Sequence, residues 1–418
     1  MTLPTLTRMA GSSLVILLCA CGKQASDRPA SRVREHVAFS LQQFPAEMRA
    51  VLKAQRAAGP PVLEPFSAPA PRAPELAGVS EFELLRLFTL QERVSQIQQF
   101  PPSGAAAGAP AAYEIEDYAK EVEASLGPLP SFNVFEKGTL IPITLNDVEL
   151  VSGQFSPTGE CDRPALLGLS TDGQCVPYSR IGRLPGINPK DGKPDPNIQW
   201  VFIARRYKIR ADANDPIFED IAIIGHHILT GETAFFQMLD HNGKDGTRVP
   251  SPMEAPGATP AGHPTAREFW LSPTQTAAAI GCNRCHDNGP FIQDPYVNQV
   301  SIVPSDPKGH YKFIGSQAFS TWSAPAQFKP VGNQCTSCHR IGTAAGSESF
   351  TQWASGEALP RQLSSAYQRY PQSHWMPPDE AATLTKDEWD TLYHQSVLQL
   401  ISCNQNPTQP ACRLQAVP

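Results

Sequence analysis

Apolar and polar positions divide the chain into segments of different pattern. Residues 21–112 hold two amphipathic stretches with helical spacing, Val33–Ala57 and Glu81–Phe100, flanked by Pro-rich and Ala/Gly-rich linkers. Residues 113–265 show short β-branched and aromatic runs separated by turn residues, the pattern of a β-rich domain. These runs predict strands at Thr139–Leu145, Asn197–Ile209, Phe218–Ile228 and Thr233–Leu239.

Turn and capping signals define the ends of several elements. Leu229–Glu232 predicts a hairpin connection between two of the strands, and Asp240–Gly246, with its Asn-Gly and Asp-Gly pairs, predicts a second turn. Thr385–Glu388 is a capping box ahead of apolar residues at helical spacing, which predicts a C-terminal helix that includes Val397. The expected fold class is α+β, with a β-rich middle domain and a mainly α-helical domain at residues 266–418.

The first 20 residues have the layout of a secretory signal peptide. Arg8 precedes the apolar run Leu14–Leu18, which is far shorter than the ~20 residues of a membrane-spanning helix, and small residues follow it. The sequence Leu18-Cys19-Ala20-Cys21 resembles the lipoprotein box of bacteria. The resemblance implies that Cys21 is lipidated and becomes the mature N-terminus. An ordinary cleaved signal peptide is the alternative.

A lipid anchor and export would set the compartment of the protein. A lipidated Cys21 would attach the chain to a membrane without a spanning segment. Gly22 stands where an Asp is associated with retention in the inner membrane of enteric bacteria, and therefore favours the outer membrane. We expect the protein to face the periplasm or the cell surface. The formal charge of −6 gives no indication of a nucleic-acid partner.

Two copies of one motif carry the chemistry of the chain. Cys282-Asn283-Arg284-Cys285-His286 and Cys335-Thr336-Ser337-Cys338-His339 both have the form C-x-x-C-H, the attachment signature of c-type haem. Two thiols three residues apart lie on one side of a helical turn, where they can form thioethers with the haem vinyl groups. The histidine that follows offers its imidazole to the iron. We expect two covalent haems c, with His286 and His339 as proximal ligands. A zinc site or a redox dithiol is the alternative.

Four cysteines remain after the signal peptide, the lipid and the two motifs. They stand as two local pairs in a compartment that favours disulfides, and free thiols are the alternative. The predicted disulfides are Cys161 with Cys175 and Cys403 with Cys412.

A segment after the second motif resembles a known ligand loop. His374-Trp375-Met376-Pro377-Pro378 is similar to the Met-Pro segment that supplies the sixth iron ligand in class I cytochromes c. The resemblance covers residues 266–418 and implies that Met376 is the distal ligand of the second haem. It also implies that the C-terminal helix packs beside that haem. His374 as the ligand is the alternative.

The distal ligand of the first haem stays open. His310 is the nearest candidate, because no methionine lies between His286 and Cys335. On a strand, His226 and His227 would point to opposite faces, so only one of them could reach the iron. A first haem with an open coordination position is a further alternative. The remoter candidates are His226, His227, Met238, Met253 and His263.

The state of the first iron separates the possible functions. Two six-coordinate irons favour an electron carrier that exchanges electrons with a redox partner protein. A five-coordinate first haem would bind peroxide or dioxygen, which resembles the di-haem cytochrome c peroxidases, although their motifs are much farther apart in sequence. A third interpretation makes residues 113–265 a module that docks a redox partner. We expect an exported, lipid-anchored di-haem cytochrome in electron transfer.

Overall fold

The computed structural model describes residues 113–418 apart from 147, 152–153, 155–160, 164–174, 256, 295, 305–307, 316, 318, 345–346, 348–350, 352–387 and 389. The described residues all belong to a unit that spans Phe82–Pro418. The two predicted helices of residues 21–112, together with Cys21, His374 and Met376, lie outside the described residues. Within the described ranges, no helix combines the length and the apolar character that crossing a membrane requires.

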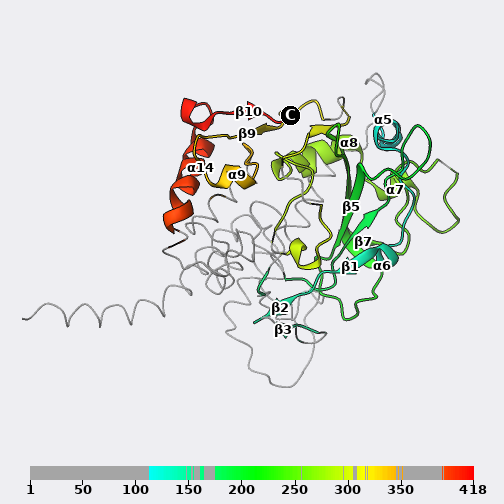
Figure 1. Cartoon of the computed structure of the whole chain (residues 1–418). Helices are drawn as coiled ribbons and strands as arrows, with labels where there is room; N and C mark the ends of the chain where they lie inside the picture. The colour runs from blue at the N-terminus through cyan, green and yellow to red at the C-terminus, as the bar shows by residue number, and fades with distance from the viewer. Residues whose placement is uncertain are drawn as a thin grey trace, which may run out of the picture. The chain divides into compact units, whose positions relative to one another are not determined.

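A six-stranded sheet forms the centre of the described part (Figure 1). The strand order is β1-β4-β5-β6-β7-β8, and every neighbouring pair is antiparallel except β7 and β8, which are parallel. The strands are β1 (Gly138–Leu140), β4 (Arg180–Leu184), β5 (Ile198–Arg205), β6 (Ile217–His227), β7 (Glu232–Asp245) and β8 (Lys312–Phe313). Strands β5, β6 and β7, with the hairpin at Leu229–Glu232, confirm three of the predicted strands and their connection.

The predicted strand Thr139–Leu145 is divided between two sheets. Its first part is β1, whereas its end is β2 (Thr144–Leu145), which pairs with β3 (Val148–Glu149). Pro142 stands between them, and proline has no N–H to donate to a strand ladder. The prediction of one continuous strand was therefore wrong.

The turn predicted at Asp240–Gly246 is also wrong, because β7 runs through it to Asp245. Asp220 pairs with Leu239 and Phe218 pairs with Lys244, so four residues of β7 lie opposite a single residue of β6. The segment is a bulge that absorbs the Asn-Gly turn signal inside a strand. Gly243, with φ 76°, provides the left-handed conformation that the bulge needs.

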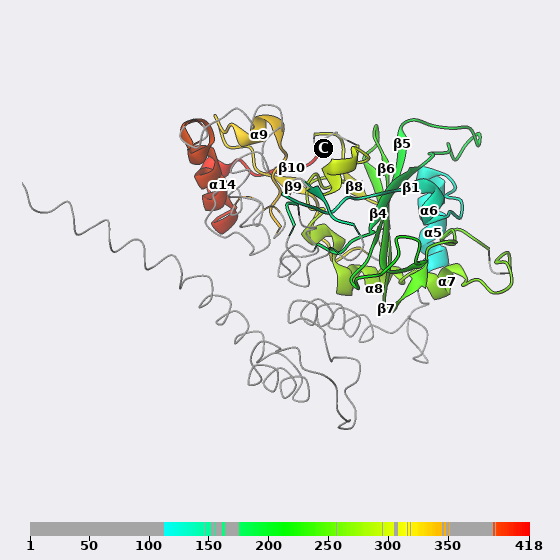
Figure 2. The ribbon, with the colours of Figure 1, turned by 90° about the horizontal axis from the view of Figure 1, so that it is seen from below.

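One face of the sheet packs under helix α5 (Ile115–Leu126) and the short helix α6 (Val134–Lys137), as Figure 2 shows. Helix α5 lies inside the predicted β-rich region, where no helix was expected, although its apolar residues recur at helical spacing. The core on this side includes Tyr118 and Val122 of α5, and Trp200, Phe202, Ile223 and Phe236 of the strands.

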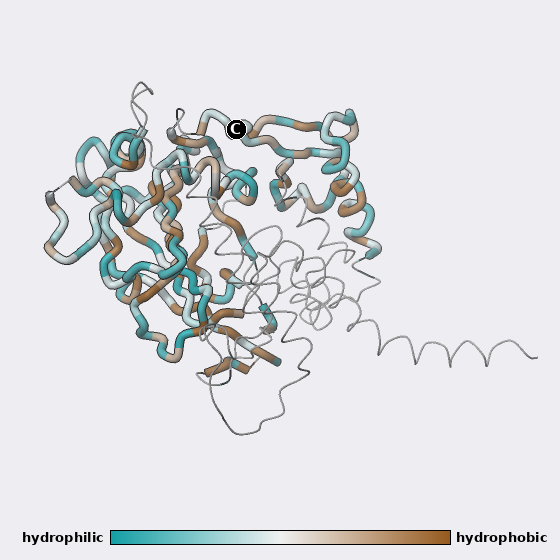
Figure 3. Tube along the Cα trace, turned by 180° about the vertical axis from the view of Figure 1, so that it is seen from behind, coloured by the Kyte–Doolittle hydropathy of each residue, from teal (hydrophilic) through white to brown (hydrophobic). Residues whose placement is uncertain are grey.

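The other face of the sheet carries a second apolar core. It joins Val201 of β5 and Leu239 of β7 to Tyr296 and Val297, and it includes the disulfide Cys161–Cys175. Figure 3 shows the apolar residues concentrated along the central strands. Because both faces are covered, the strands of this sheet are apolar on both sides rather than on one.

The core continues across the predicted boundary at residue 265. Phe269, Trp270, Ile314 and Phe319 pack in the same cluster as the strands of the sheet. The elements in this stretch are α7 (Ala266–Phe269), α8 (Pro273–Gln275), the π-helical turn η1 (Thr276–Ile280) and the 3₁₀ turns η2 (Cys282–Arg284) and η3 (Val297–Val300). The first C-x-x-C-H motif begins at η2, shortly after the residues of α7 and η1 that pack on the sheet.

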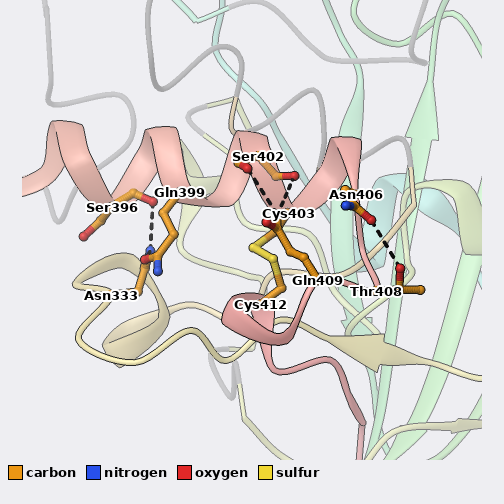
Figure 4. The surroundings of a disulfide bond; sticks show 9 residues. All are labelled: Asn333, Ser396, Gln399, Ser402, Cys403, Asn406, Thr408, Gln409 and Cys412. Atoms are coloured by element: carbon orange, nitrogen blue, oxygen red, sulfur yellow. Dashed lines mark hydrogen bonds between the residues drawn. A yellow bond between two sulfur atoms is a disulfide. The ribbon is translucent and has the colours of Figure 1, made fainter.

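The remaining elements surround the second motif. They are β9 (Ala326–Gln327), α9 (Cys335–Cys338), the π-helical turn η4 (Asp390–His394), α14 (Gln395–Gln405), the 3₁₀ turn η5 (Pro410–Cys412) and β10 (Gln415–Ala416), which pairs with β9. Helix α14 confirms the predicted C-terminal helix. The disulfide Cys403–Cys412 ties it to η5, as predicted (Figure 4). The described residues thus confirm a β-rich region with a small number of helices.

Candidate functional site

Both C-x-x-C-H motifs adopt one helical turn. The N–H of His286 donates to the carbonyl of Cys282 at 2.8 Å, and the N–H of His339 donates to the carbonyl of Cys335 at the same distance. The turn brings both cysteines and the histidine of each motif together, as their spacing predicts. The four sulfurs of these motifs are thiols, whereas the other four described cysteines form disulfides.

The first motif lies against the sheet. The His286 ring packs on Phe235 of β7, with 5.6 Å between the ring centroids. The Tyr311 hydroxyl donates to the carbonyl of His286 at 2.6 Å, and the Trp322 indole N–H donates to the carbonyl of Ala277, in the turn before the motif, at 3.2 Å. The sheet and the segment around Tyr311 therefore fix the first motif from both sides.

Burial controls the ionisation of the first motif. Burial raises the pKa of the Cys282 thiol to about 12, with the neighbouring Cys285 acting in the same direction. Burial lowers the pKa of His286 to about 4, and the positive charge of Arg205 lowers it further. The imidazole is consequently neutral at physiological pH and keeps a ring nitrogen with a lone pair for a metal.

The positive charge that acts on His286 belongs to Arg205, which forms an ion pair on the sheet. Arg205 of β5 pairs with Asp220 of β6 at 2.8 Å, and the Gln237 amide of β7 donates to the same carboxylate at 2.6 Å. Asp220 is almost fully buried, and Arg205 is one-quarter exposed. A buried carboxylate is stable here because both of its oxygens have donors.

The second motif packs against the C-terminal helix. Cys335 packs against Val397 of α14, as do Tyr393 of the preceding turn and Ile401. Burial raises the pKa of Cys335 to about 11 and, together with the nearby Lys308, lowers the pKa of His339. Thus the second histidine is also favoured in its neutral form.

Polar contacts hold α14 beside the second motif. The Asn333 amide donates to the carbonyl of Ser396 at 2.8 Å and to Gln399 Oε1 at 2.9 Å (Figure 4). The Gln334 N–H donates to Ser396 Oγ at 2.9 Å. Both donors come directly before Cys335. The start of the motif turn is therefore fastened to the helix that covers it.

The two motifs lie close together, because the residues that follow them bond to each other. Asn288, two residues after His286, and Arg340, next after His339, exchange hydrogen bonds. Neither residue stood out in the sequence. Their positions just beyond the two histidines are the only signal that the sequence offers, since the contact joins residues 52 apart.

The candidates for a distal ligand at the first motif lie in different places. His310 is exposed, and its backbone packs against Gly231 at the tip of the β6–β7 hairpin. His226 is buried on β6, where its Nδ1 pairs with Thr233 Oγ1 at 2.9 Å, and Thr233 shares a sheet face with Phe235. His227, one residue on, points to the opposite face and caps the hairpin turn through its Nδ1.

The remaining candidates lie elsewhere. Met238 is buried in the core under α5, on the face of β7 opposite to Phe235. Met253 packs against the same core, and its sulfur accepts the N–H of Leu129 at 3.1 Å. His263 is exposed.

A cavity of about 400 Å³ lies away from both motifs, between α5, β7 and the α7–α8 segment. Its lining includes Met238, Leu239 and Trp270, with the ion pair Asp240–Lys244 at its edge. It contains no residue of either C-x-x-C-H turn.

The turns suit a group that is held by two sulfurs and one imidazole. The buried Nδ1 of His286 has no hydrogen-bond partner in the described part of the chain. The backbone of Pro290 and Gly289 lies beside the ring and raises its pKa, but outside hydrogen-bond geometry. The imidazole is neutral at physiological pH and the turn holds it beside the two cysteines, so His286 fits the role of an iron ligand. Among the described residues, no group of three or more His, Cys, Asp or Glu side chains is arranged to hold a metal ion.

Comparison with known proteins found no matching family model, no matching curated protein and no matching solved structure.

Proposed function

We propose that the protein is an exported, lipid-anchored di-haem c-type cytochrome that mediates electron transfer. The observation that carries the proposal is the pair of C-x-x-C-H turns, which have the same hydrogen bond from histidine N–H to the first cysteine and thiols outside any disulfide. Haem c supplies a one-electron couple at iron, and the chain sets its potential through ligands, burial and access.

The roles of the chain's own residues follow from their chemistry. Cys282 and Cys285 hold the first group, Cys335 and Cys338 hold the second, and the adjacent histidines bind the irons. Met376 is proposed as the distal ligand at the second turn and His310 at the first. The region around the second turn then belongs to a mainly α-helical haem domain, and a redox partner protein exchanges electrons with it.

The experiment that tests the proposal is a count of covalent haem. After expression with a cytochrome c maturation system, intact mass should show two haems that survive acid–acetone extraction. Cys282→Ser and Cys335→Ser should each disrupt one attachment, because each removes a thioether sulfur. The double variant Cys161→Ser/Cys175→Ser is the matched control, since it alters cysteines outside the motifs and should keep both haems.

Two results would overturn the proposal. A wild-type product that carries zinc, or no covalent haem, would remove its basis. Rapid peroxide turnover by a wild-type protein with a high-spin first haem would show an enzyme rather than an electron carrier.

A further inference from the structure

The residues that follow the two motifs hydrogen-bond in both directions. Asn288 Nδ2 donates to the carbonyl of Arg340 at 2.7 Å, and Arg340 Nη1 donates to the carbonyl of Asn288 at 2.8 Å. Asn288 comes two residues after His286, and Arg340 comes next after His339. Each motif therefore holds the backbone of the other beside its own histidine.

Further contacts brace this pair. The Asp287 carboxylate accepts the N–H of Ala344 at 2.8 Å and the Ser347 hydroxyl at 3.2 Å. Gly342 lies so close that a Cβ on it would be 2.1 Å from Asp287 Oδ2. The segment after the second motif thus fits against the segment after the first with no room for a side chain at position 342.

Arg340 joins a third segment to the pair. Its Nη2 donates to the carbonyl of Gly309 at 2.5 Å while Nη1 bonds to Asn288, and the residue is only 8% exposed. The planar guanidinium fork is suited to two carbonyls at fixed angles, whereas a lysine ammonium cannot span them in the same way. The geometry is therefore specific to arginine.

We infer that Asn288 and Arg340 are positioning residues that hold the two haem attachment turns at a fixed separation and orientation. The inference rests on the proposed function, because it concerns the groups that the proposal assigns to these turns. Both residues act through the backbone that carries His286 and His339, without contact to the iron. Paired hydrogen bonds between partly buried groups resist displacement, because breaking one leaves a donor or acceptor with restricted access to water unsatisfied.

Circular dichroism in the Soret region tests the inference. Two haems that are close and fixed in orientation couple their Soret transitions and give paired bands of opposite sign. The wild type should show this couplet. Arg340→Lys and Asn288→Ala should each keep both haems and lower the couplet several-fold. Arg413→Lys, at an exposed arginine directly after η5, is the matched control and should leave the couplet unchanged.

The outcomes separate the inference from the proposed function. A wild type without two covalent haems overturns the proposed function itself. A wild type with two haems but no couplet, or an unchanged couplet in both variants, overturns the positioning role and leaves the proposed function standing. If one variant does not fold, the other variant and the wild-type spectrum still decide.

Discussion

A single charged side chain adjusts the pKa values that burial sets around the first motif. Arg205 acts on several buried groups there, because its positive charge lowers the pKa of His286, Asp294 and Tyr296 relative to burial alone. Burial is nevertheless the largest influence on each of them. Burial thus shifts the pKa of the imidazole down and the pKa of the Asp294 carboxyl up, and both shifts favour the neutral form of the group.

Asp294→Asn should change the pH dependence of stability. Burial raises the pKa of Asp294 from 3.8 to about 6, so the folded state binds this proton more tightly than the unfolded state. The wild type therefore loses stability from this group as pH rises between these values. Asparagine keeps the oxygen that accepts the N–H groups of Tyr296 and Val297 and does not ionise.

The variant should consequently gain stability relative to wild type across that window. Urea unfolding of both proteins at about pH 4 and about pH 7 measures the difference. If the free energy of unfolding depends on pH equally in the two proteins, the pKa of Asp294 is not raised in the folded state.

Met376→Ala should remove the weak charge-transfer absorption that ferric His/Met haem shows at the red end of the visible spectrum. It should also lower the potential of the second haem, because a thioether ligand favours the ferrous state. Redox titration with optical detection measures both effects. His310→Ala should leave that band intact and convert the first haem to high spin. A spectrum that Met376→Ala leaves unchanged would instead point to His374.

At the scale of elements, helix α14 is fixed at both ends, and its first turn is bonded to the residues before the second motif. Asn333 and Gln334 bond to its first turn, and the disulfide Cys403–Cys412 closes its last turn onto η5. The N–H of Lys329 donates to the carbonyl of Cys412 at 3.0 Å, which joins η5 to the segment between β9 and the motif. These hydrogen bonds and the disulfide hold α14 in the position where it packs against Cys335.

Removal of the disulfide Cys403–Cys412 should weaken the packing of α14 against Cys335. Cys403→Ser/Cys412→Ser should lower the free energy of unfolding by about 2–3 kcal/mol, because the bond closes a short loop and restricts the unfolded chain. Since α14 packs against Cys335, the absorption of the second haem should also change. Urea unfolding and optical spectra measure the two effects.

Cys161→Ser/Cys175→Ser is the control for this change. Its disulfide also closes a short loop, with a sequence separation of 14, but it lies in the core on the sheet. It should cost a similar stability and leave the spectrum of the second haem unaltered. Equal spectral effects of the two double variants would refute a specific role of α14.

At the scale of the whole described part, the sheet and the first C-x-x-C-H motif pack together. Phe235 of β7 contacts His286, and residues after 265 share the core with the strands. The β-rich region thus forms part of the environment of the first motif. Arg205, on β5, shows the consequence, because its charge acts on His286 from the sheet.

Cys21→Ser tests how the whole protein is anchored. The proposed lipid on Cys21 supplies membrane affinity through its acyl chains, so the variant should remain unprocessed or become soluble. Fractionation of cells and electrophoretic migration measure the change, with Cys19→Ser, two residues earlier in the proposed signal peptide, as the control. A Cys21→Ser protein that fractionates and migrates like the wild type would remove the lipoprotein interpretation.

The sequence by itself predicted the features that depend on neighbours within a few residues. The C-x-x-C-H spacing required one turn, and both motifs have it. The two disulfides close short loops, so the local pairs were the natural partners. Strands β5, β6 and β7 follow from apolar, β-branched runs between turn residues, because such runs fit a pleated surface.

Only the tertiary structure decided what depends on residues far apart in the chain. The Asn-Gly signal after Leu239 became a bulge, because β6 continues to pair with β7 beyond it. The face of β6 that carries His226, and not His227, is the face of Phe235 at the first motif, which the register of the sheet sets. The bonds between Asn288 and Arg340 join residues 52 apart, and no local pattern announces such a pair. Packing of the whole chain selects these contacts, since their free energy is gained only when distant segments meet.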